Sequence, residues 1–576
     1  MNALPFRIKI GVTGKRENLP AIPLLKNKIW QVLGIDEWNL DKTVANNSIF
    51  SLFQNESPAQ LKKAKNTPIA FSILSALAEG ADRIVAEVIL ETRNAKLEVV
   101  LPLAKEDYLT DFKTATSKFE FEQFLKKDPF AIALRNKNIE DEYSESNRSE
   151  ARRKAYFQGG KYIVDHCDVL IVLWDGVEAA GKGGTFDVMK YAEKNGRPYI
   201  LIDSTDPDKE VKLVKGNGIH AEAIAHIDHF NTMEVPLQTI NAYKENVFKE
   251  YFNEKDFAWS KNFNPRVLTV LKENLFPYYA KASLLATSYK NRYKWTGQLA
   301  YIFSTVAVII LFTSIVFDYN TLLAFILEFF LLLFIFSIIT LAQKGRVHSG
   351  WLEYRFLVER IRACPYFFLA GKEVSGVMTS SNSSPKAIKG QWAVMVFSEI
   401  WHQLYSKYQK KVDAQKENPF NPDLIPYVQK SLIKGQIGFQ EKYFKRNNRK
   451  NDFLERGGRI IFFMAILAAL VHIILSYMYH DLPRFHLLHQ ILTVLALSLP
   501  TIAAAFEGVR RQSEYSRNKN RSEAMKANLE ELDNKFESAE GEEEFYKLLR
   551  EADITMLSET KEWMMLMVPS ELEYIC

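Results

Sequence analysis

Three polar, glycine-rich stretches in the first third of the chain contain residue types suited to holding an anion. They are Gly11-Val-Thr-Gly-Lys-Arg16, Ala78-Glu-Gly-Ala-Asp82 and Gly183-Gly-Thr185, the last followed closely by Asp187. Glycine lets backbone N–H groups approach an anion, and the start of a helix adds a partial positive charge. These stretches therefore predict phosphate binding, although turns between strands and helices are also glycine-rich for steric reasons alone.

The best-known motifs for nucleotide hydrolysis and for metal binding are absent from the sequence. The chain has neither the G-x-x-x-x-G-K-[ST] nor the G-x-G-x-x-G spacing, which excludes ATP hydrolysis by a P-loop. Its three cysteines, Cys167, Cys364 and Cys576, have no metal-ligand spacing and cannot form a disulfide framework. We expect no metal, no cofactor and a reducing compartment for the soluble parts.

A charged stretch, 137–157, adds a second group of candidates. Arg148, Arg152 and Tyr156 recur at i, i+4 and i+8, which places them on one side of a helix. That side could offer an arginine clamp to a phosphate and an aromatic ring to a base. An ordinary solvated helix face is the alternative.

Five short apolar runs must position these residues. They lie at 6–12, 68–74, 97–101, 168–174 and 198–202. The runs are nearly continuous rather than alternating, and helical segments separate them, which predicts a parallel, doubly wound α/β sheet. Ligands of such sheets bind beyond the carboxyl ends of the strands, where the strand order reverses. The glycine-rich stretches follow the first, second and fourth runs.

Four of these blocks together resemble the SLOG superfamily: GVTGKR at 11–16, SALAEGADRIVAE at 75–87, CDVLIVLWDG at 167–176 and GKGGTFDVMKYA at 181–192. This is the Rossmann-like fold shared by the Smf/DprA DNA-processing proteins, the LOG nucleotide hydrolases and the front of the TRPM channels. The resemblance covers about residues 1–205 and implies a nucleotide-type ligand, such as an ADP-ribose derivative or a cyclic nucleotide. The ligand-facing candidates it implies are Gly11, Thr13, Gly14, Lys15, Arg16, Glu79, Gly80, Asp82, Gly183, Gly184 and Thr185.

The sequence departs from the hydrolases of this superfamily at their catalytic position. They carry Pro-Gly-Gly-x-Gly-Thr-x-x-Glu, whereas Val188 stands here at the glutamate and Asp187 lies one residue earlier. A shift of one helical position turns a side chain by about 100°. We therefore expect binding without catalysis, with Asp187 among the ligand-binding residues. A nucleotide or N-glycoside hydrolase that uses Asp187, Glu79 or Asp82 is the competing interpretation.

The second half of the chain contains four apolar segments long enough to cross a bilayer. The stretch 298–344 holds two runs of about twenty residues around Asp318-Tyr-Asn320, and 460–477 and 487–506 form a second pair. Basic residues precede the first span and follow the second span of each pair. The tip that joins the two spans has no basic residue in the first pair and only Arg484 in the second. By the positive-inside rule, the tips lie outside and both termini in the cytoplasm. We expect a multi-pass protein of a bacterial cell membrane.

An internal repeat links the two pairs. A shift of 164 residues places Thr321–Leu341 on Phe485–Ala505 and Trp351 on Tyr515. The pattern Trp351-x-x-x-Arg355-x-x-x-Glu359, with its counterpart at 515–523, resembles the SLATT family of two-span modules from bacterial conflict systems. That resemblance implies a membrane effector. Glu359 with Arg355 and Arg362 also predicts an ion-pair ladder along one helix.

Two polar residues inside the spans are candidates for lining a pore. Glu328 lies roughly 12 Å inside the second span, where an ionisable group is costly and should face protein or water. His472 lies in the third span. Either residue could instead be a hydrogen-bonded packing residue.

The sequence thus predicts an α/β Rossmann-like domain followed by an all-α, four-span domain. The expected boundaries are 1–205 for the nucleotide sensor, 206–294 for bridging helices, and 295–425 and 426–576 for two SLATT-like units. We expect a homo-oligomer that senses a messenger made by an upstream enzyme and permeabilises the membrane in antiviral defence. The formal charge of +5 argues against a nucleic-acid partner. A ligand-gated channel with a physiological role is a further alternative.

Overall fold

The computed structural model spans the whole chain, which divides into two compact units. One comprises Met1–Glu234 with Gly376–His402, and the other Val235–Ser375 with Gln403–Cys576. The structure describes all residues except 18, 20, 37, 39–46, 55–56, 129, 178–183, 253–261, 375–390, 412–419, 480–484 and 568–576.

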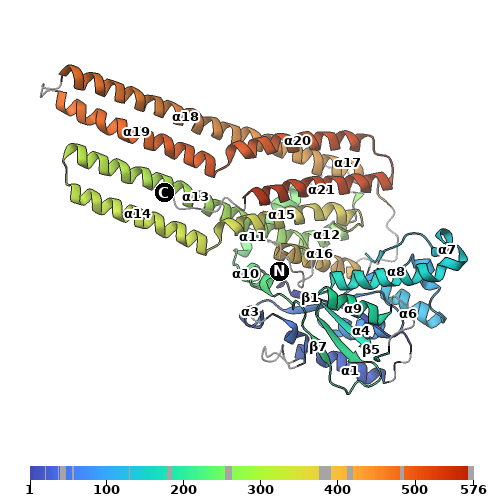
Figure 1. Cartoon of the computed structure of the whole chain (residues 1–576). Coiled ribbons are helices and arrows are strands. Elements are labelled where there is room, and N and C mark those ends of the chain that lie inside the picture. Colours follow the sequence, from blue (N-terminus) through green and yellow to red (C-terminus); the bar gives the residue numbers. More distant parts are fainter. Residues whose placement is uncertain are drawn as a thin grey trace. The chain divides into compact units, whose positions relative to one another are not determined.

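A mixed, mostly parallel sheet forms the centre of the first unit (Figure 1). The described residues give seven strands: β1 (Phe6–Gly14), β2 (Ile69–Ser75), β3 (Lys96–Leu101), β4 (Ile132–Ala133), β5 (Val169–Trp174), β6 (Tyr199–Asp203) and β7 (Lys212–Val214). Their order is β4-β3-β2-β1-β5-β6-β7, and only β7 is antiparallel to its neighbour. The chain builds outward from β1 to β4 and then returns to β1 with β5, so the order reverses between β1 and β5.

The five strands predicted from apolar runs are confirmed, each within two residues at either end. These strands are buried almost along their whole length, which explains why their sequences are continuously apolar. Strands β4 and β7 were not predicted from the sequence, because with two and three residues they are too short to give a periodic hydrophobic signal. Both lie at the edges of the sheet.

Helices cover both faces of the sheet. Side chains alternate between the faces of a strand, so Gly11 and Gly14 of β1 point to opposite sides. A side-chain carbon on Gly11 would meet Ile163 of α8, and one on Gly14 would meet Ala81 of α4. The helices of this unit are α1 (Ile22–Leu33), η1 (Ile49–Leu52), α3 (Ser57–Lys63), α4 (Ala81–Glu91), α5 (Lys105–Leu109), α6 (Ala115–Leu125), α7 (Ile139–Glu142), α8 (Glu145–His166), α9 (Thr185–Lys194) and α10 (Glu222–Thr232).

The sheet unit extends past residue 205 and includes a segment from much later in the chain. Strand β7 pairs with β6, and α10 buries Ile224, Ile227 and Phe230. The beginning of α16 (Gln391–Lys411) also belongs here: the ring of Trp392 stacks on His226 at 5.9 Å. The stretch predicted as a bridge therefore contributes its first part, to Glu234, to the sheet unit.

The second unit is helical. Besides the rest of α16 it contains α11 (Leu237–Tyr251), α12 (Pro265–Asn274), α13 (Phe276–Phe317), α14 (Thr321–Lys344), α15 (Val347–Leu369), α17 (Leu424–Val428), η3 (Gln429–Lys434), α18 (Gly435–Tyr479), α19 (His486–Gln512), α20 (Tyr515–Glu537) and α21 (Glu542–Met567). In Figure 1, α13 with α14 and α18 with α19 form two long helical hairpins.

Among the described residues, four helical stretches are long and apolar enough to cross a membrane, as predicted. They contain the apolar parts of α13, α14, α18 and α19, and at most 17 % of each apolar window is buried. Large apolar side chains are exposed from Ile302 to Leu341, from Ile460 to Met478 and from Leu487 to Leu497. Because such a surface is unfavourable in water, the structure indicates a membrane protein.

The two hairpins continue into matching helices, but one helical turn away from the predicted register. Helices α15 and α20 both have 23 residues and begin 168 residues apart, after Arg346 and Glu514, which share a left-handed backbone. At this shift every buried residue of α20 falls on a buried residue of α15. The predicted shift of 164 fails here because α19 begins 165 residues after α14 and is three residues longer, which gives a shift of 168 after the hairpins.

Candidate functional site

The sheet edge where β1 and β5 end is the candidate site predicted from sequence. Gly14 lies beside Leu173 in the parallel register, so the polar residues after β1 and after β5 emerge at the same edge. Gly80 and Gly184 precede α4 and α9, which begin just beyond the carboxyl ends of β2 and β5. In open α/β sheets this edge, at the reversal of strand order, is the usual place for a ligand.

Lys15 connects the two central strands across this edge. Its backbone N–H donates to the Leu173 carbonyl at 3.2 Å, and its ammonium group forms an ion pair with Asp175. Burial alone would raise the pKa of the Asp175 carboxyl, but the hydrogen bond from Lys15 leaves that pKa below its usual value. About a third of the Lys15 side chain remains exposed, so a ligand can reach it.

Steric demands account for the glycines at this edge. A side-chain carbon on Gly14 would lie 2.4 Å from Ala81 Cβ and 2.8 Å from the Leu173 carbonyl oxygen. Gly80 has φ of +78°, and a side-chain carbon there would lie 2.4 Å from the Arg16 carbonyl oxygen. Gly11 is buried inside β1 against α8, away from the edge, so it cannot contact a ligand there.

Asp82 is buried in the first turn of α4 and holds the junction between β2 and that helix. Its carboxylate accepts hydrogen bonds from the Ser75 hydroxyl at 3.2 Å and from the Ala78 N–H at 3.3 Å. Burial raises the pKa of Asp82 to about 6, and the hydrogen bonds oppose this shift only in part. The Asp82 carboxylate is thus occupied by hydrogen bonds that stabilise the fold. The neighbouring Glu79 is half-buried.

The predicted arginine clamp is already engaged with carboxylates of the same unit. Arg152 forms ion pairs with Asp107 and, at 2.6 Å, with Asp111. Arg16 lies 3.8 Å from Asp111 and 4.8 Å from the centre of the Tyr156 ring. The structure therefore brings Arg16, Arg152 and Tyr156 together. A phosphate that binds these arginines must compete with Asp107 and Asp111.

Arg148 stands apart from this cluster: its guanidinium donates to the Tyr143 carbonyl at 3.4 Å. Thr13 lies near the end of β1, while Thr185 and Asp187 are half-buried in the first turn of α9. Gly183 lies outside the described residues. In the described part of this edge, Lys15, Arg16 and Arg152 each lie beside an aspartate, so their positive charges are already neutralised.

The two pore candidates differ in their surroundings. His472 of α18 shares a hydrogen bond of 3.2 Å with the Thr493 hydroxyl of α19, so it packs the second hairpin. Glu328 is half-buried in α14, between exposed apolar side chains, and no described residue forms an ion pair with it. Of the two, Glu328 therefore remains the stronger candidate for lining a pore.

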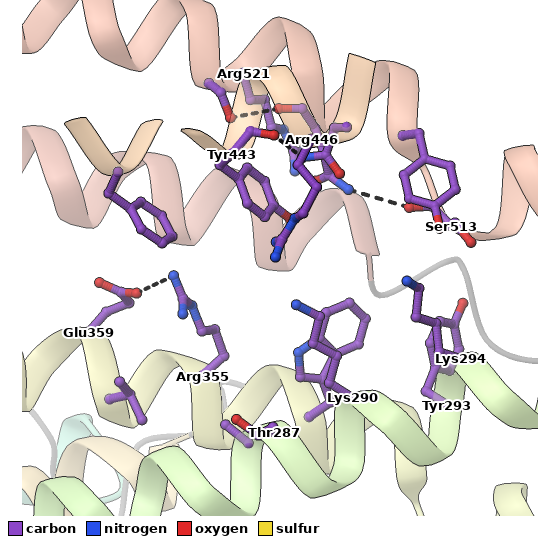
Figure 2. Close-up of a pocket in the computed structure, with 18 of the residues that line it drawn as sticks. Thr287, Lys290, Tyr293, Lys294, Arg355, Glu359, Tyr443, Arg446, Ser513 and Arg521 are labelled. Carbon is purple, nitrogen blue, oxygen red and sulfur yellow. Dashed lines mark hydrogen bonds and ion pairs between the residues drawn. The ribbon is translucent and has the colours of Figure 1, made fainter. Parts of the chain in front are cut away.

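The predicted ion-pair ladder is present, and it borders a cavity that sequence analysis missed. Glu359 pairs with Arg355 at 2.5 Å and with Arg362. Beside it, a cavity of about 450 Å³ opens among α13, α15, α18 and α20 (Figure 2). The basic pairs Lys290/Lys294 and Arg446/Lys450, each spaced i, i+4, were the signal that could have revealed it.

Among the described residues, no group of three or more His, Cys, Asp or Glu side chains is arranged to hold a metal ion. Comparisons of the chain with protein-family models, with curated proteins and with solved structures find no match.

Proposed function

We propose that this chain is a membrane-embedded effector controlled by a nucleotide-derived messenger. In this proposal the sheet unit is a Rossmann-like, SLOG-like sensor, and the two hairpins with their following helices are SLATT-like units of the cell membrane. Binding of the messenger changes the packing of the spanning helices in a homo-oligomer and permeabilises the bilayer.

The observation that carries the sensing part is the pair formed by Lys15 and Asp175 at the reversal of strand order. A ligand phosphate can take over the Lys15 ammonium from Asp175, which would release the Asp175 carboxylate just after β5. This exchange gives a ligand a direct way to alter the conformation of the sheet edge. The engaged state of Asp82 favours binding over hydrolysis, because its carboxylate already has two structural hydrogen bonds.

The membrane part rests on the exposed apolar helices and on Glu328. One hairpin pair with a single intramembrane carboxylate offers few groups to line an aqueous path, so several copies must contribute to one pore. A bacterial origin and a role in antiviral defence follow only from the resemblances of the sequence.

The sensing proposal is tested with the full-length protein in a neutral detergent. Small molecules retained through purification are identified by mass spectrometry, and binding of ADP-ribose and of cyclic dinucleotides is measured by calorimetry. Lys15→Ala should weaken nucleotide binding about tenfold, the loss expected for one charge-assisted hydrogen bond. Lys113→Ala is the matched control, since Lys113 is an exposed lysine that pairs with Glu17 on the surface. Equal affinity of the parent and Lys15→Ala would contradict the proposal.

The effector proposal is tested with the same protein in liposomes. Addition of the nucleotide that binds should start leakage of ions from the parent, and Lys15→Ala should need a higher nucleotide concentration for the same leakage. Turnover of the nucleotide without leakage would support the hydrolase alternative. A selective ion current without dye leakage would support a regulated channel.

A further inference from the structure

The cavity among α13, α15, α18 and α20 is formed by both halves of the repeat. Helices α13 and α15 belong to the first hairpin unit, and α18 and α20 to the second. Figure 2 shows Lys290, Lys294 and Arg355 pointing from the first pair of helices toward Arg446 and Tyr443 of α18. Whatever occupies this space contacts both hairpin units at once.

The described lining is strongly unbalanced in charge. It contains seven basic side chains and one carboxylate, so its formal charge is six positive. The carboxylate, Glu359, is already shared by two arginines. The remaining bases form no ion pair with any described carboxylate: Lys290, Lys294, Arg446, Lys450 and Arg521. Lys290 is also repelled by four like charges around it. Such a cluster is unfavourable unless an anion neutralises it.

Buried polar atoms of the lining also lack partners. Both terminal nitrogens of the Arg521 guanidinium are buried and have no hydrogen-bond partner in the described part of the chain. The same holds for the amide nitrogen and oxygen of Gln512. Buried polar groups in native proteins are almost always hydrogen-bonded, so the three donor nitrogens of Arg521 and Gln512 indicate a missing partner with acceptor oxygens.

The size and the walls of the cavity fit a phosphate-bearing molecule. Ligand pockets typically hold about 300–1,000 Å³, and this cavity is within that range. Its walls also include aromatic rings, among them Tyr443, Trp351 and Tyr515. A second hollow shares Lys294, Lys450 and Tyr515 with it and is lined further by Trp295, Phe453 and other apolar residues.

The cavity lies just beyond the apolar part of the spans. Lys294 precedes Ile302, the first exposed large aliphatic residue of α13, by eight residues, or about 12 Å of helix. This depth is where lipid headgroups lie, and basic pockets between spanning helices bind anionic headgroups. A free phosphate compound in the cytoplasm can reach the same residues.

We propose that this cavity binds a phosphate-bearing anion, and that the bound anion holds the two hairpin units together. Phosphate oxygens accept hydrogen bonds from Arg521 and Arg446 and neutralise the lysines of α13. Occupancy then stabilises the packed arrangement of the two hairpins, because it relieves the repulsion among the five bases that form no ion pair. The site does not involve the sheet edge, so either site can exist without the other.

The test uses the full-length protein and reads its unfolding temperature. In neutral detergent the probes are inorganic pyrophosphate and ATP. In nanodiscs of zwitterionic lipid, the probe is added phosphatidylglycerol. A rise in unfolding temperature with the soluble probes identifies a free phosphate ligand, and a rise with phosphatidylglycerol alone identifies a lipid headgroup. No rise with any of these probes would overturn the proposal.

Variants separate this site from general surface charge. Lys290→Gln and Arg446→Gln should each weaken the response to the effective probe about tenfold. Arg292→Gln and Lys442→Gln are matched controls, because these exposed residues lie on the same two helices but outside the cavity, and they should respond like the parent. An equal loss in the controls, or an unchanged response in Lys290→Gln and Arg446→Gln, would overturn the proposal.

A third readout distinguishes a ligand site from a merely structural cluster. Without any added anion, Lys290→Gln should raise the unfolding temperature, because it removes one of several repelling charges. A lower unfolding temperature in that state would mean that Lys290 stabilises the ligand-free fold, against the proposal. Lys15→Ala should keep the full response, so failure at the sheet edge and failure here give different results.

Discussion

Replacing Glu399 by glutamine is expected to destabilise the sheet unit, although Glu399 lies almost 400 residues from the strand it supports. Its two carboxylate oxygens receive the Arg7 guanidinium at 2.9 and 3.1 Å. Arg7 lies in β1 and Glu399 in α16; the Glu399 side chain is buried, at 4 % exposure, and the Arg7 side chain is mostly covered, at 13 % exposure. The substitution keeps the shape of the side chain and removes only its charge.

The size of the effect follows from the burial of Arg7. Removing one partner of a buried ion pair leaves an uncompensated charge and costs about 3–5 kcal/mol. Arg7 keeps hydrogen bonds to the carbonyls of Phe71 at 2.7 Å and Asn94 at 2.9 Å. We therefore expect the lower end of that range, about 3 kcal/mol. Replacing both partners together, Arg7→Met with Glu399→Leu, should recover most of the loss, because an apolar pair often substitutes for a buried ion pair.

Hydrogen exchange of the slowest amides in β1 and β2 of the full-length protein measures this free energy. Glu17→Gln is the control, since Glu17 and Lys113 form an exposed pair and the exchange rates should not change. The assignment of 376–402 to the sheet unit is wrong if Glu399→Gln leaves the exchange of β1 unchanged. It is also wrong if the losses of unfolding free energy in Arg7→Met and in Glu399→Leu simply add up in the double variant.

Three further predictions use other parts of the structure. Because the pKa of Asp82 rises from 3.8 to about 6 on folding, the parent should lose stability as the pH increases from about 4 to 6. Asp82→Asn removes that loss, so the free energy of unfolding of the variant relative to the parent should grow by up to about 3 kcal/mol across this pH range. Denaturant unfolding at each pH measures the difference. A fragment ending at Thr205 should lack a cooperative unfolding transition, because it loses β7, α10 and Glu399, and a normal transition would contradict the discontinuous unit. Glu328→Gln should lower cation flux in liposomes without changing membrane insertion, and unchanged flux would remove Glu328 from the conduction path.

Local signals in the sequence were sufficient for the strands and the apolar helices. A strand buried on both faces, such as β5, is a continuous apolar run, and a bilayer-crossing helix is a longer one, so neither depends on knowing its partners. The turn Asp318-Tyr-Asn320 and the ladder around Glu359 were equally predictable, because they involve residues close in sequence. Strand β7 was not predicted, because three residues are too few to show a hydrophobic periodicity.

Interactions between distant segments decided the rest. Arg152 was expected to face a ligand, but tertiary packing places Asp107 and Asp111 against it, and no spacing in the sequence reveals those partners. The repeat register of α20 depends on where a left-handed residue ends the preceding helix, which hydrophobicity alone does not locate.

By itself, the sequence determined that this protein has buried parallel strands and four helices suited to a membrane, since hydrophobic burial is encoded residue by residue along the chain. Only the tertiary structure decided which charges are neutralised and which remain in excess. Electrostatic pairing depends on distances between segments far apart in sequence, and that is why the balanced sheet edge and the basic cavity between the two hairpin units became visible only in three dimensions.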